Sequence, residues 1–197
     1  MAEEASFRDL IERVRLGDEP ATAELLHRYE PALRRVIQVR LFDARVRRVH
    51  DGDDICQSVL ASFFVRLALG QYDVDTPEAL IRLLAAMARN KIIDKGRRCD
   101  LEGRAEQRIP ISEIPEQALA SGEDTPSKIV ALRELVQEAR RRLNPEERQI
   151  LDLRQQGMEW ADVAAHVGGK AEALRKRMER AAALVAEQLG LAGDEDE

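Results

Sequence analysis

Apolar residues in this chain recur every three or four positions, the spacing that places them on one face of an α-helix. Near the N-terminus, for example, Phe7, Leu10, Ile11 and Val14 follow this pattern. No segment alternates polar and apolar residues convincingly, as a half-buried strand does. Charged residues make up 35% of the 197 residues and aromatic residues only 4%, a composition that also favours helices. The sequence therefore predicts an all-α fold.

The helical pattern is interrupted by an acidic segment. Residues 99–132 carry 3 basic and 7 acidic residues, whereas residues 1–98 and 133–193 each have a net charge of +1. We predict two small helical domains at residues 1–98 and 126–191, a flexible acidic linker at 99–125 and an acidic tail at 192–197. The formal net charge of −6 thus comes from the linker and the tail. It does not exclude nucleic-acid binding by either domain.

Local signals mark several helix ends and one irregularity. Thr76-Pro77-Glu78 places a capping residue, a proline and an early acid at the start of a helix. Asn144-Pro145-Glu146-Glu147 does the same for another helix, with Glu147 placed for a capping box. Pro31 is predicted to bend or split the helix that starts near residue 20.

Residues 159–180 predict a helix-turn-helix, with a short helix, a turn at Gly168-Gly169 and a longer basic helix. Between residues 170 and 180 there are five basic and two acidic residues. The N-terminal part of such a helix can enter a major groove, where long basic side chains reach guanine edges or phosphates. An ordinary solvated helix face explains the same charges. The spacing alone leaves both interpretations open.

The sequence offers little for catalysis. Glu24 and His27 form a Glu-x-x-His pair, but carboxylate-bridged metal sites need two such motifs, and only one copy is present. There is no glycine-rich phosphate loop. Cys56 and Cys99 lack metal-ligand spacing, and we expect Cys56 to pack rather than react. We therefore expect no enzymatic activity, no metal and no cofactor.

The expected location is a reducing cytoplasm, without membrane attachment. Two cysteines cannot form a disulfide framework. No apolar run approaches the roughly 18 residues that a membrane span needs. The acidic N-terminus lacks the basic and apolar regions of a signal peptide.

Two blocks of the sequence resemble the sigma factors of bacterial RNA polymerase, in particular the small extracytoplasmic-function (ECF) class. The first block, similar to region two of that family, comprises Asp53-Asp54-Ile55-Cys56-Gln57-Ser58-Val59, Phe63-Phe64 and Met87-Ala88-Arg89-Asn90-Lys91-Ile92-Ile93-Asp94 with Arg97-Arg98. The second, similar to region four, comprises residues 143–151, 159–164 and 174–178. The resemblance covers about residues 6–98 and 126–190.

For the first block, the resemblance implies docking on the clamp helices of the largest polymerase subunit and capture of a flipped base of the −10 element. The polymerase-binding residues would be Asp53, Asp54, Gln57 and Ser58. The −10 residues would be Tyr72, Arg89, Asn90, Lys91, Lys95, Arg97 and Arg98. Tyr72 is the only aromatic residue of the loop 70–76. It suits a base-binding pocket and a place in the core equally well, so both interpretations remain open.

For the second block, the resemblance implies binding to the −35 duplex and contact with the flap of the second-largest subunit. The −35 residues would be Lys170, Arg175, Lys176, Arg177 and Arg180. Leu174 and Met178 should instead face the core of the domain. Gly168-Gly169 departs from the family's glycine-apolar turn, and Glu172 lies early in the helix, where an acid repels phosphate. The resemblance also admits an anti-sigma protein as a partner.

The predicted function is promoter recognition: binding to core RNA polymerase, recognition of −35 and −10 promoter DNA, and strand opening. One alternative is a stand-alone helix-turn-helix regulator that binds a palindrome as a dimer, although the chain shows no separate dimerisation segment. Another is a helical protein-interaction adaptor whose basic helix is merely solvated. The acidic linker is predicted to keep the free protein off non-specific DNA until polymerase separates the domains.

Overall fold

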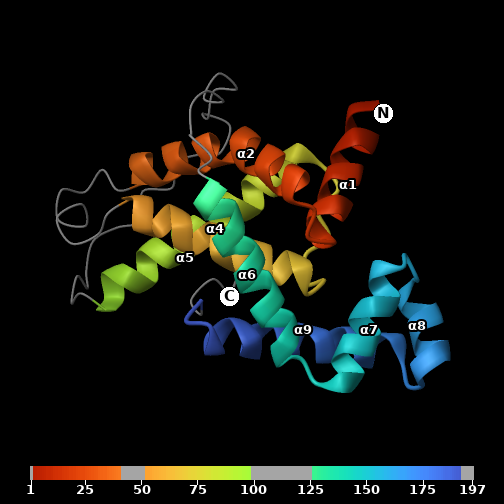
Figure 1. The fold of residues 1–197 in the computed structure, drawn as a ribbon. Coiled ribbons are helices and arrows are strands. Elements are labelled where there is room, and N and C mark those ends of the chain that lie inside the picture. The colour runs from red at the N-terminus through yellow and green to blue at the C-terminus, as the bar shows by residue number, and fades with distance from the viewer. Residues whose placement is uncertain (1, 41–51, 99–125, 192–197) are drawn as a thin grey trace.

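The computed structural model describes residues 2–40, 52–98 and 126–191, with side chains described for residues 5–39, 52–94 and 126–191. The predicted linker and tail lie outside these ranges. The regular structure within them is entirely helical, which confirms the all-α prediction (Figure 1). The helices are α1 (Ala2–Arg15), α2 (Glu19–Arg40), α4 (Gly52–Ala68), α5 (Pro77–Arg98), α6 (Pro126–Arg142), α7 (Pro145–Gln155), α8 (Trp160–Val167) and α9 (Ala171–Gln188).

Two predicted helix starts are confirmed by their capping hydrogen bonds. The Thr76 hydroxyl accepts from the backbone N–H of Ala79 at 3.2 Å at the start of α5. At the start of α7, the Asn144 side chain accepts from the N–H of Glu147 at 2.9 Å, and the Glu147 carboxylate accepts from the N–H of Asn144 at 3.0 Å. These bonds satisfy donors that the first turn of a helix otherwise leaves without partners.

Of the two outcomes predicted at Pro31, a bend or a split, the split does not occur, because α2 continues through this residue from Glu19 to Arg40. Proline has no N–H and therefore removes one hydrogen bond of the helix. Side chains on both sides of it are deeply buried, with Leu26 at 0% and Leu33 at 2% exposure. Packing of this apolar face against the core compensates for the missing bond.

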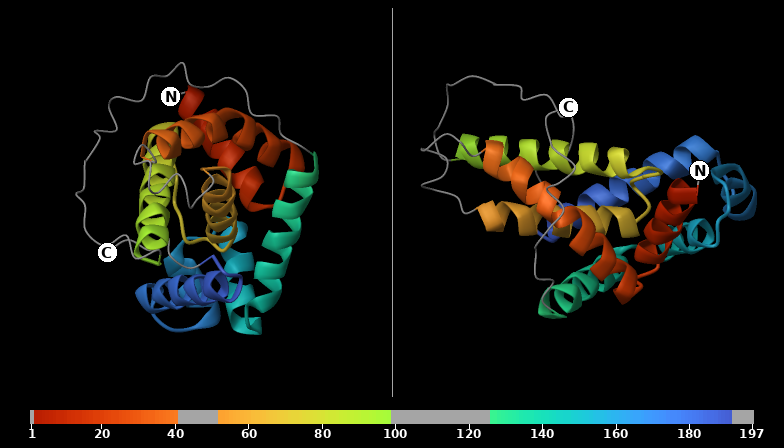
Figure 2. Two further views of the ribbon diagram at one scale, coloured as in Figure 1. Left: turned by 90° about the vertical axis from the view of Figure 1, so that its left-hand side faces the viewer. Right: turned by 90° about the horizontal axis from the view of Figure 1, so that it is seen from above.

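Helices α1, α2, α4 and α5 form a first module around one apolar core. Its helices meet in pairs, α1 with α2, α2 with α5, and α4 with all three. Helix α4 lies at the centre, enclosed by its neighbours (Figure 2, left). Core side chains with at most 2% exposure include Phe7, Ile11, Leu25, Leu26, Ile55, Leu60, Phe63, Leu80 and Leu84.

Helices α6 to α9 form a second, smaller module. Its core contains Leu143, Ile150, Leu151, Val163, Leu174 and Met178. The same cluster also includes Val65 and Leu69 from the first module, at 0% and 1% exposure. Helices α8 and α9 are joined by Gly168 and Gly169 with φ of +86° and +99°, values that side chains with a Cβ rarely adopt.

The two modules pack against each other along an inter-module interface, in which α6 contacts α2 and α4, and α9 contacts α4. Leu132 of α6 is 7% exposed and belongs to the first core. Lys128 and Arg133 of α6 form ion pairs with Glu30 and Glu19 of α2. The apolar clusters therefore do not divide at residue 126, where the sequence predicts a domain to begin.

Candidate polymerase and DNA interfaces

The predicted polymerase-binding residues lie together on the first turns of α4. Asp53, Asp54 and Gln57 are exposed and Ser58 is half-buried. Ile55, on the opposite face, is completely buried. The amphipathic pattern of the sequence thus leaves a polar stripe available at this end of the helix.

A residue that sequence reasoning missed, Arg34 of α2, contacts this stripe. Its guanidinium forms an ion pair with Asp53 and a second one with Glu30 at 2.8 Å. Burial is the largest single influence on the pKa of Arg34 and lowers it. The hydrogen bond that Arg34 donates to Glu30 and the nearby negative charges of Glu30 and Asp53 together outweigh burial, so the pKa is raised on balance. Arg34 therefore stays charged and fixes one carboxylate of the stripe. The spacing of Glu30 and Arg34 was a visible i, i+4 signal for half of this arrangement.

The loop predicted to capture a −10 base is held by α1. The Arg15 guanidinium donates to the carbonyl oxygen of Tyr72 at 2.5 Å and to the carboxylate of Asp73 at 3.0 Å. The Tyr72 ring is half-buried and stacks on Phe63, with centroids 6.3 Å apart and an angle of 12° between the planes. Tyr72 thus packs against the core in this structure, as one of the two sequence interpretations expects. Arg15 was not foreseen.

The other predicted −10 residues belong to the last turns of α5. Arg89 and Asn90 are half-buried, and Lys91 is only 8% exposed. In this arrangement Lys91 presents little surface to a phosphate. The side chains of Lys95, Arg97 and Arg98 lie outside the described residues.

Four of the five predicted −35 residues lie on α9, which has a clear division of faces, and Lys170 directly precedes this helix as its N-cap residue. Leu174 and Met178 are 8% and 4% exposed and belong to the second core, as the sequence predicts. The basic face carries Lys170, Arg175, Lys176 and Arg180, all exposed, and Arg177, which is half-buried. The basic side chains of α9 are thus accessible on the outer surface of a helix-turn-helix.

Acidic neighbours balance much of this basic face. Arg175 contacts Glu172 at 3.4 Å and Glu179 at 3.6 Å. Arg177 contacts Glu146, in the first turn of α7, at 2.6 Å. Exposed ion pairs of this kind contribute about 0–1 kcal/mol each. DNA phosphates can therefore replace the carboxylates at little energetic cost.

The one described cysteine is buried rather than reactive. Cys56 is completely inaccessible. Burial raises the pKa of its thiol to about 12, with the Glu30 carboxylate adding to the effect. A thiol with this pKa is almost wholly protonated at neutral pH and is a poor nucleophile. Among the described residues, no group of three or more His, Cys, Asp or Glu side chains forms a metal site.

The predicted residues thus form two separate sets. The polar stripe of α4, the loop 70–76 and the end of α5 belong to the first module, and the basic face belongs to α9 in the second.

Of the described helices, none has both the length and the apolar character required to cross a bilayer.

Comparison with known proteins identifies the class to which this arrangement belongs. The model of the ECF sigma factor family matches residues 4–190, nearly the whole chain. The chain therefore belongs to the ECF sigma factors, and its role is that of a sigma factor in transcription initiation. Members of this family bind core RNA polymerase and promoter DNA, and they are regulatory proteins rather than enzymes. The searches of curated proteins and of solved structures found no match.

Proposed function

We propose that this sigma factor divides its work between the two modules. The first docks on the clamp helices of the largest polymerase subunit through Asp53, Asp54, Gln57 and Ser58, and binds the −10 element with the loop 70–76 and the end of α5. The second binds the −35 duplex through α9 and contacts the flap of the second-largest subunit. The observation that carries this proposal is the division of α9 into a buried apolar face and an exposed basic face.

The geometry of α9 supports the −35 step. A B-DNA major groove is about 12 Å wide and admits one helix. Leu174 and Met178 anchor the inner face of α9 in the second core, so Arg175 and Lys176 can approach the duplex without unfolding anything. Contacts to base edges supply specificity and contacts to phosphates supply affinity. Glu172 forms ion pairs with Arg175 and Lys176 here. It therefore offsets part of the positive charge on this face and contributes to the sequence preference.

The −10 step requires a pocket that binds an unstacked base and thereby favours the melted strand. Within this loop, Tyr72 stacks on Phe63 of α4, and the pair supplies an aromatic surface. Arg89 and Asn90 follow on α5, where Asn90 reads a base edge and Arg89 holds a phosphate. We propose that Lys91 joins them only after a rearrangement of its surroundings, because it is 8% exposed here.

A reconstituted transcription assay tests this proposal. The protein is mixed with core polymerase and a library of promoter fragments, and the transcripts are sequenced. We expect initiation at defined sites with shared −35 and −10 elements. With polymerase shown to be active, failure to initiate at defined sites contradicts the proposal. Binding of the free protein to a palindromic duplex, or to no DNA even at low salt, would favour the stand-alone regulator or the adaptor, respectively.

Two single substitutions test the division of labour. Arg175→Ala should weaken binding of the holoenzyme to the −35 duplex about tenfold, within the roughly 1–3 kcal/mol expected for one good contact. Asp54→Ala should mainly weaken binding to core polymerase. The matched controls are Arg141→Ala, an exposed arginine on α6, and Asp9→Ala, an exposed acid on α1. If Arg175→Ala and Asp54→Ala impaired the same step, the assignment would be wrong.

A further inference from the structure

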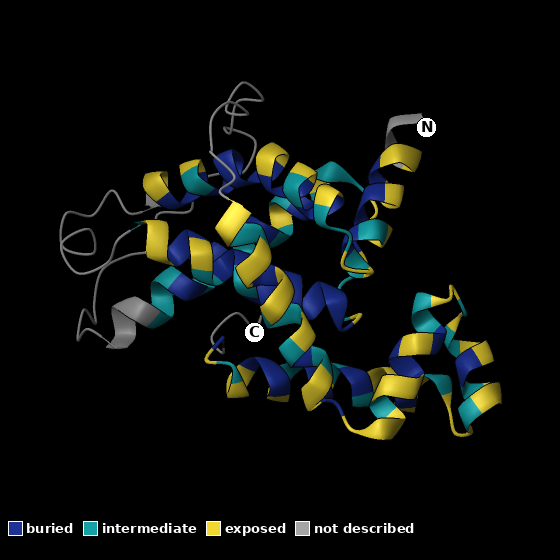
Figure 3. Ribbon diagram, in the orientation of Figure 1, coloured by how far each residue is buried: buried dark blue, intermediate teal, exposed yellow. Residues whose placement is uncertain are grey.

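The polar stripe of α4 and the surface that the second module covers lie on the same face of this helix. Residues three or four positions apart are neighbours on a helix surface. Gln57 and Ser58 therefore lie in one row with Ala61, Val65 and Leu69. Gln57 is exposed, whereas Val65 and Leu69 are 0% and 1% exposed and belong to the second core. The change from exposed to buried along α4 is visible in Figure 3. The second module therefore covers the continuation of the proposed docking face.

A chain of ion pairs connects this cover to the docking residues themselves. Lys128 of α6 binds one carboxylate oxygen of Glu30, which is 3% exposed, and Arg34 binds the other. Arg34 in turn binds Asp53 at the start of the stripe. Lys128 of the second module thus helps to neutralise the buried carboxylate of Glu30. The same carboxylate positions Arg34, and Arg34 positions Asp53.

The inter-module interface reaches the proposed −10 loop as well. The Arg140 guanidinium of α6 donates to the backbone oxygen of Arg15 at 2.7 Å, and the Arg15 side chain binds Tyr72. At the beginning of the loop, a Cβ added to Gly70 would lie 3.9 Å from Cδ1 of Leu151 in α7. The loop that should receive a DNA base is therefore bounded by the second module.

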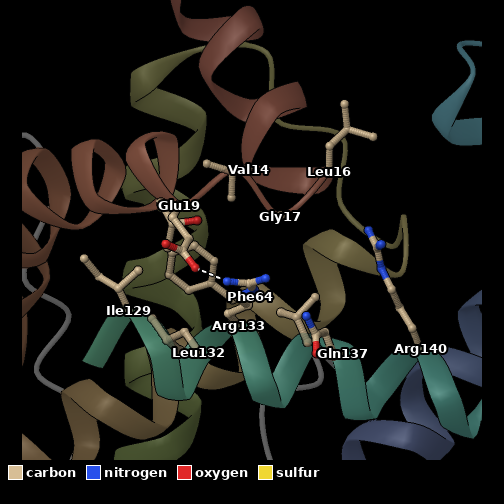
Figure 4. Close-up of a pocket in the computed structure, with 12 residues that line it drawn as sticks. Val14, Leu16, Gly17, Glu19, Phe64, Ile129, Leu132, Arg133, Gln137 and Arg140 are labelled. Carbon is tan, nitrogen blue, oxygen red and sulfur yellow. Dashed lines mark hydrogen bonds and ion pairs between the residues drawn. The ribbon is translucent and has the colours of Figure 1, made fainter. Parts of the chain in front are cut away.

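This interface is incompletely packed. A pocket of about 180 Å³, partly open to solvent, lies between α6 and the helices α1, α2 and α4, lined by Val14, Phe64, Ile129 and Leu132 among others (Figure 4). In the described part of the chain, five side-chain atoms are buried without a hydrogen-bond partner, and three of them, Arg15 Nε, Arg140 Nε and Gln155 Nε2, belong to residues around this interface. Permanent interiors are close-packed and satisfy such groups. These features suit an interface that opens.

The geometry of a promoter also requires that the inter-module interface open. The −35 and −10 elements are about 25 base pairs apart, which is about 85 Å of duplex at 3.4 Å per pair. Helix α9 packs on α4, and its 18 residues extend only about 27 Å at 1.5 Å per residue. The two proposed DNA-binding surfaces are therefore too close together to occupy both elements at once.

We propose that the second module is an intramolecular competitor of polymerase: in the free protein it covers part of the clamp-docking face of α4 and bounds the −10 loop, and docking on polymerase displaces it. The proposal rests on the function proposed above and adds a control step that uses no other protein.

A reversible cross-link tests this competition. Glu19→Cys and Arg133→Cys, introduced together with Cys99→Ser, replace an ion pair whose side chains are 45% and 53% exposed, and the buried Cys56 is protected from the reagent. A reducible bismaleimide that joins the two cysteines holds the interface closed. We expect the linked protein to bind core polymerase at least tenfold more weakly than the same protein after reduction. The matched control carries the same link within α6, between Glu134→Cys and Glu138→Cys, and should bind normally.

The opposite change should favour opening. Lys128→Glu places a second acid beside buried Glu30, and we expect polymerase affinity to rise threefold or more. Arg141→Glu makes the same charge change on an outer face of α6 and should leave it unchanged. Equal polymerase binding by the linked and reduced proteins, or unchanged binding by Lys128→Glu, would overturn the proposal. Failure of the unlinked protein to initiate transcription would instead count against the proposed function.

Discussion

The two modules bury their apolar residues in different ways. The first closes a core from four helices, with Phe7 packed edge-on against Tyr29 at 6.0 Å and Phe63 against Phe64 at 5.4 Å. The second has no comparable aromatic centre. Helix α8 contributes a single fully buried side chain, Val163. The cluster is completed by Val65 of α4 and by Leu69, the residue directly after this helix.

This difference shows how a small module can be stabilised. Small modules bury a low fraction of their surface and are marginally stable alone. The second module compensates with local signals, such as the capping box of α7, and with apolar contacts provided by its neighbour. Its position against the first module is therefore part of its stability, and any partner that displaces it must supply equivalent contacts. DNA and polymerase would be such partners.

The largest expected effect is on the self-contained core. Phe63→Ala removes a fully buried ring that contacts both Phe64 and Tyr72. We expect a loss of about 3–5 kcal/mol in the free energy of unfolding, measured by urea denaturation followed by circular dichroism. An effect below about 1 kcal/mol would show that the first module does not depend on this ring.

A somewhat smaller effect tests the residues that the two modules share. Leu69→Ala should cost about 2–4 kcal/mol, within the range for a buried leucine. Hydrogen exchange should report the loss mainly in the amides of α9, while those of α2 stay protected. Equal loss of protection in α2 and α9 would mean that the two modules unfold as one unit.

Alkaline pH should act on the first module through Cys56. The pKa of this thiol is raised from 9.0 to about 12 in the folded protein. Between these values the unfolded chain releases a proton that the folded protein retains, so stability falls as the pH rises from about 9 towards 12. One proton gives a slope of at most about 1.4 kcal/mol per pH unit. Urea midpoints should fall more steeply with pH for the native protein than for Cys56→Ala; parallel slopes would contradict this.

The smallest effect concerns the capping box. Asn144→Ala removes the acceptor for the Glu147 N–H and should destabilise the second module by about 1 kcal/mol. Because Glu147 also lies 3.9 Å from Arg177, binding to the −35 duplex should weaken slightly. Thermal unfolding monitored by Trp160 fluorescence reports the second module selectively. An unchanged transition would show that the contacts to α4 alone set its stability.

The sequence predicts those structural features that depend on residues close together in the chain. Apolar spacing identifies the helices and the inward orientation of Leu174 and Met178, and the residues around Asn144 identify a helix start. It does not predict contacts between distant residues. Lys128 reaches Glu30 across 98 positions and Arg15 reaches Tyr72 across 57, and no local pattern indicates such pairs. The absence of a split at Pro31 has the same origin, because packing from other helices outweighs a local helix-breaking signal.

The central claim is that the modules are packed together in the free protein and apart on polymerase. Spin labels at Gln38→Cys on α2 and Glu187→Cys on α9, both exposed sites, with Cys99→Ser, allow their separation to be measured by pulsed electron paramagnetic resonance. We predict one narrow, short distance in the free protein. With core polymerase and promoter DNA it should lengthen by tens of ångströms, because the promoter elements span about 85 Å. The same distance in both states, or a broad long distance in the free protein, would contradict the account.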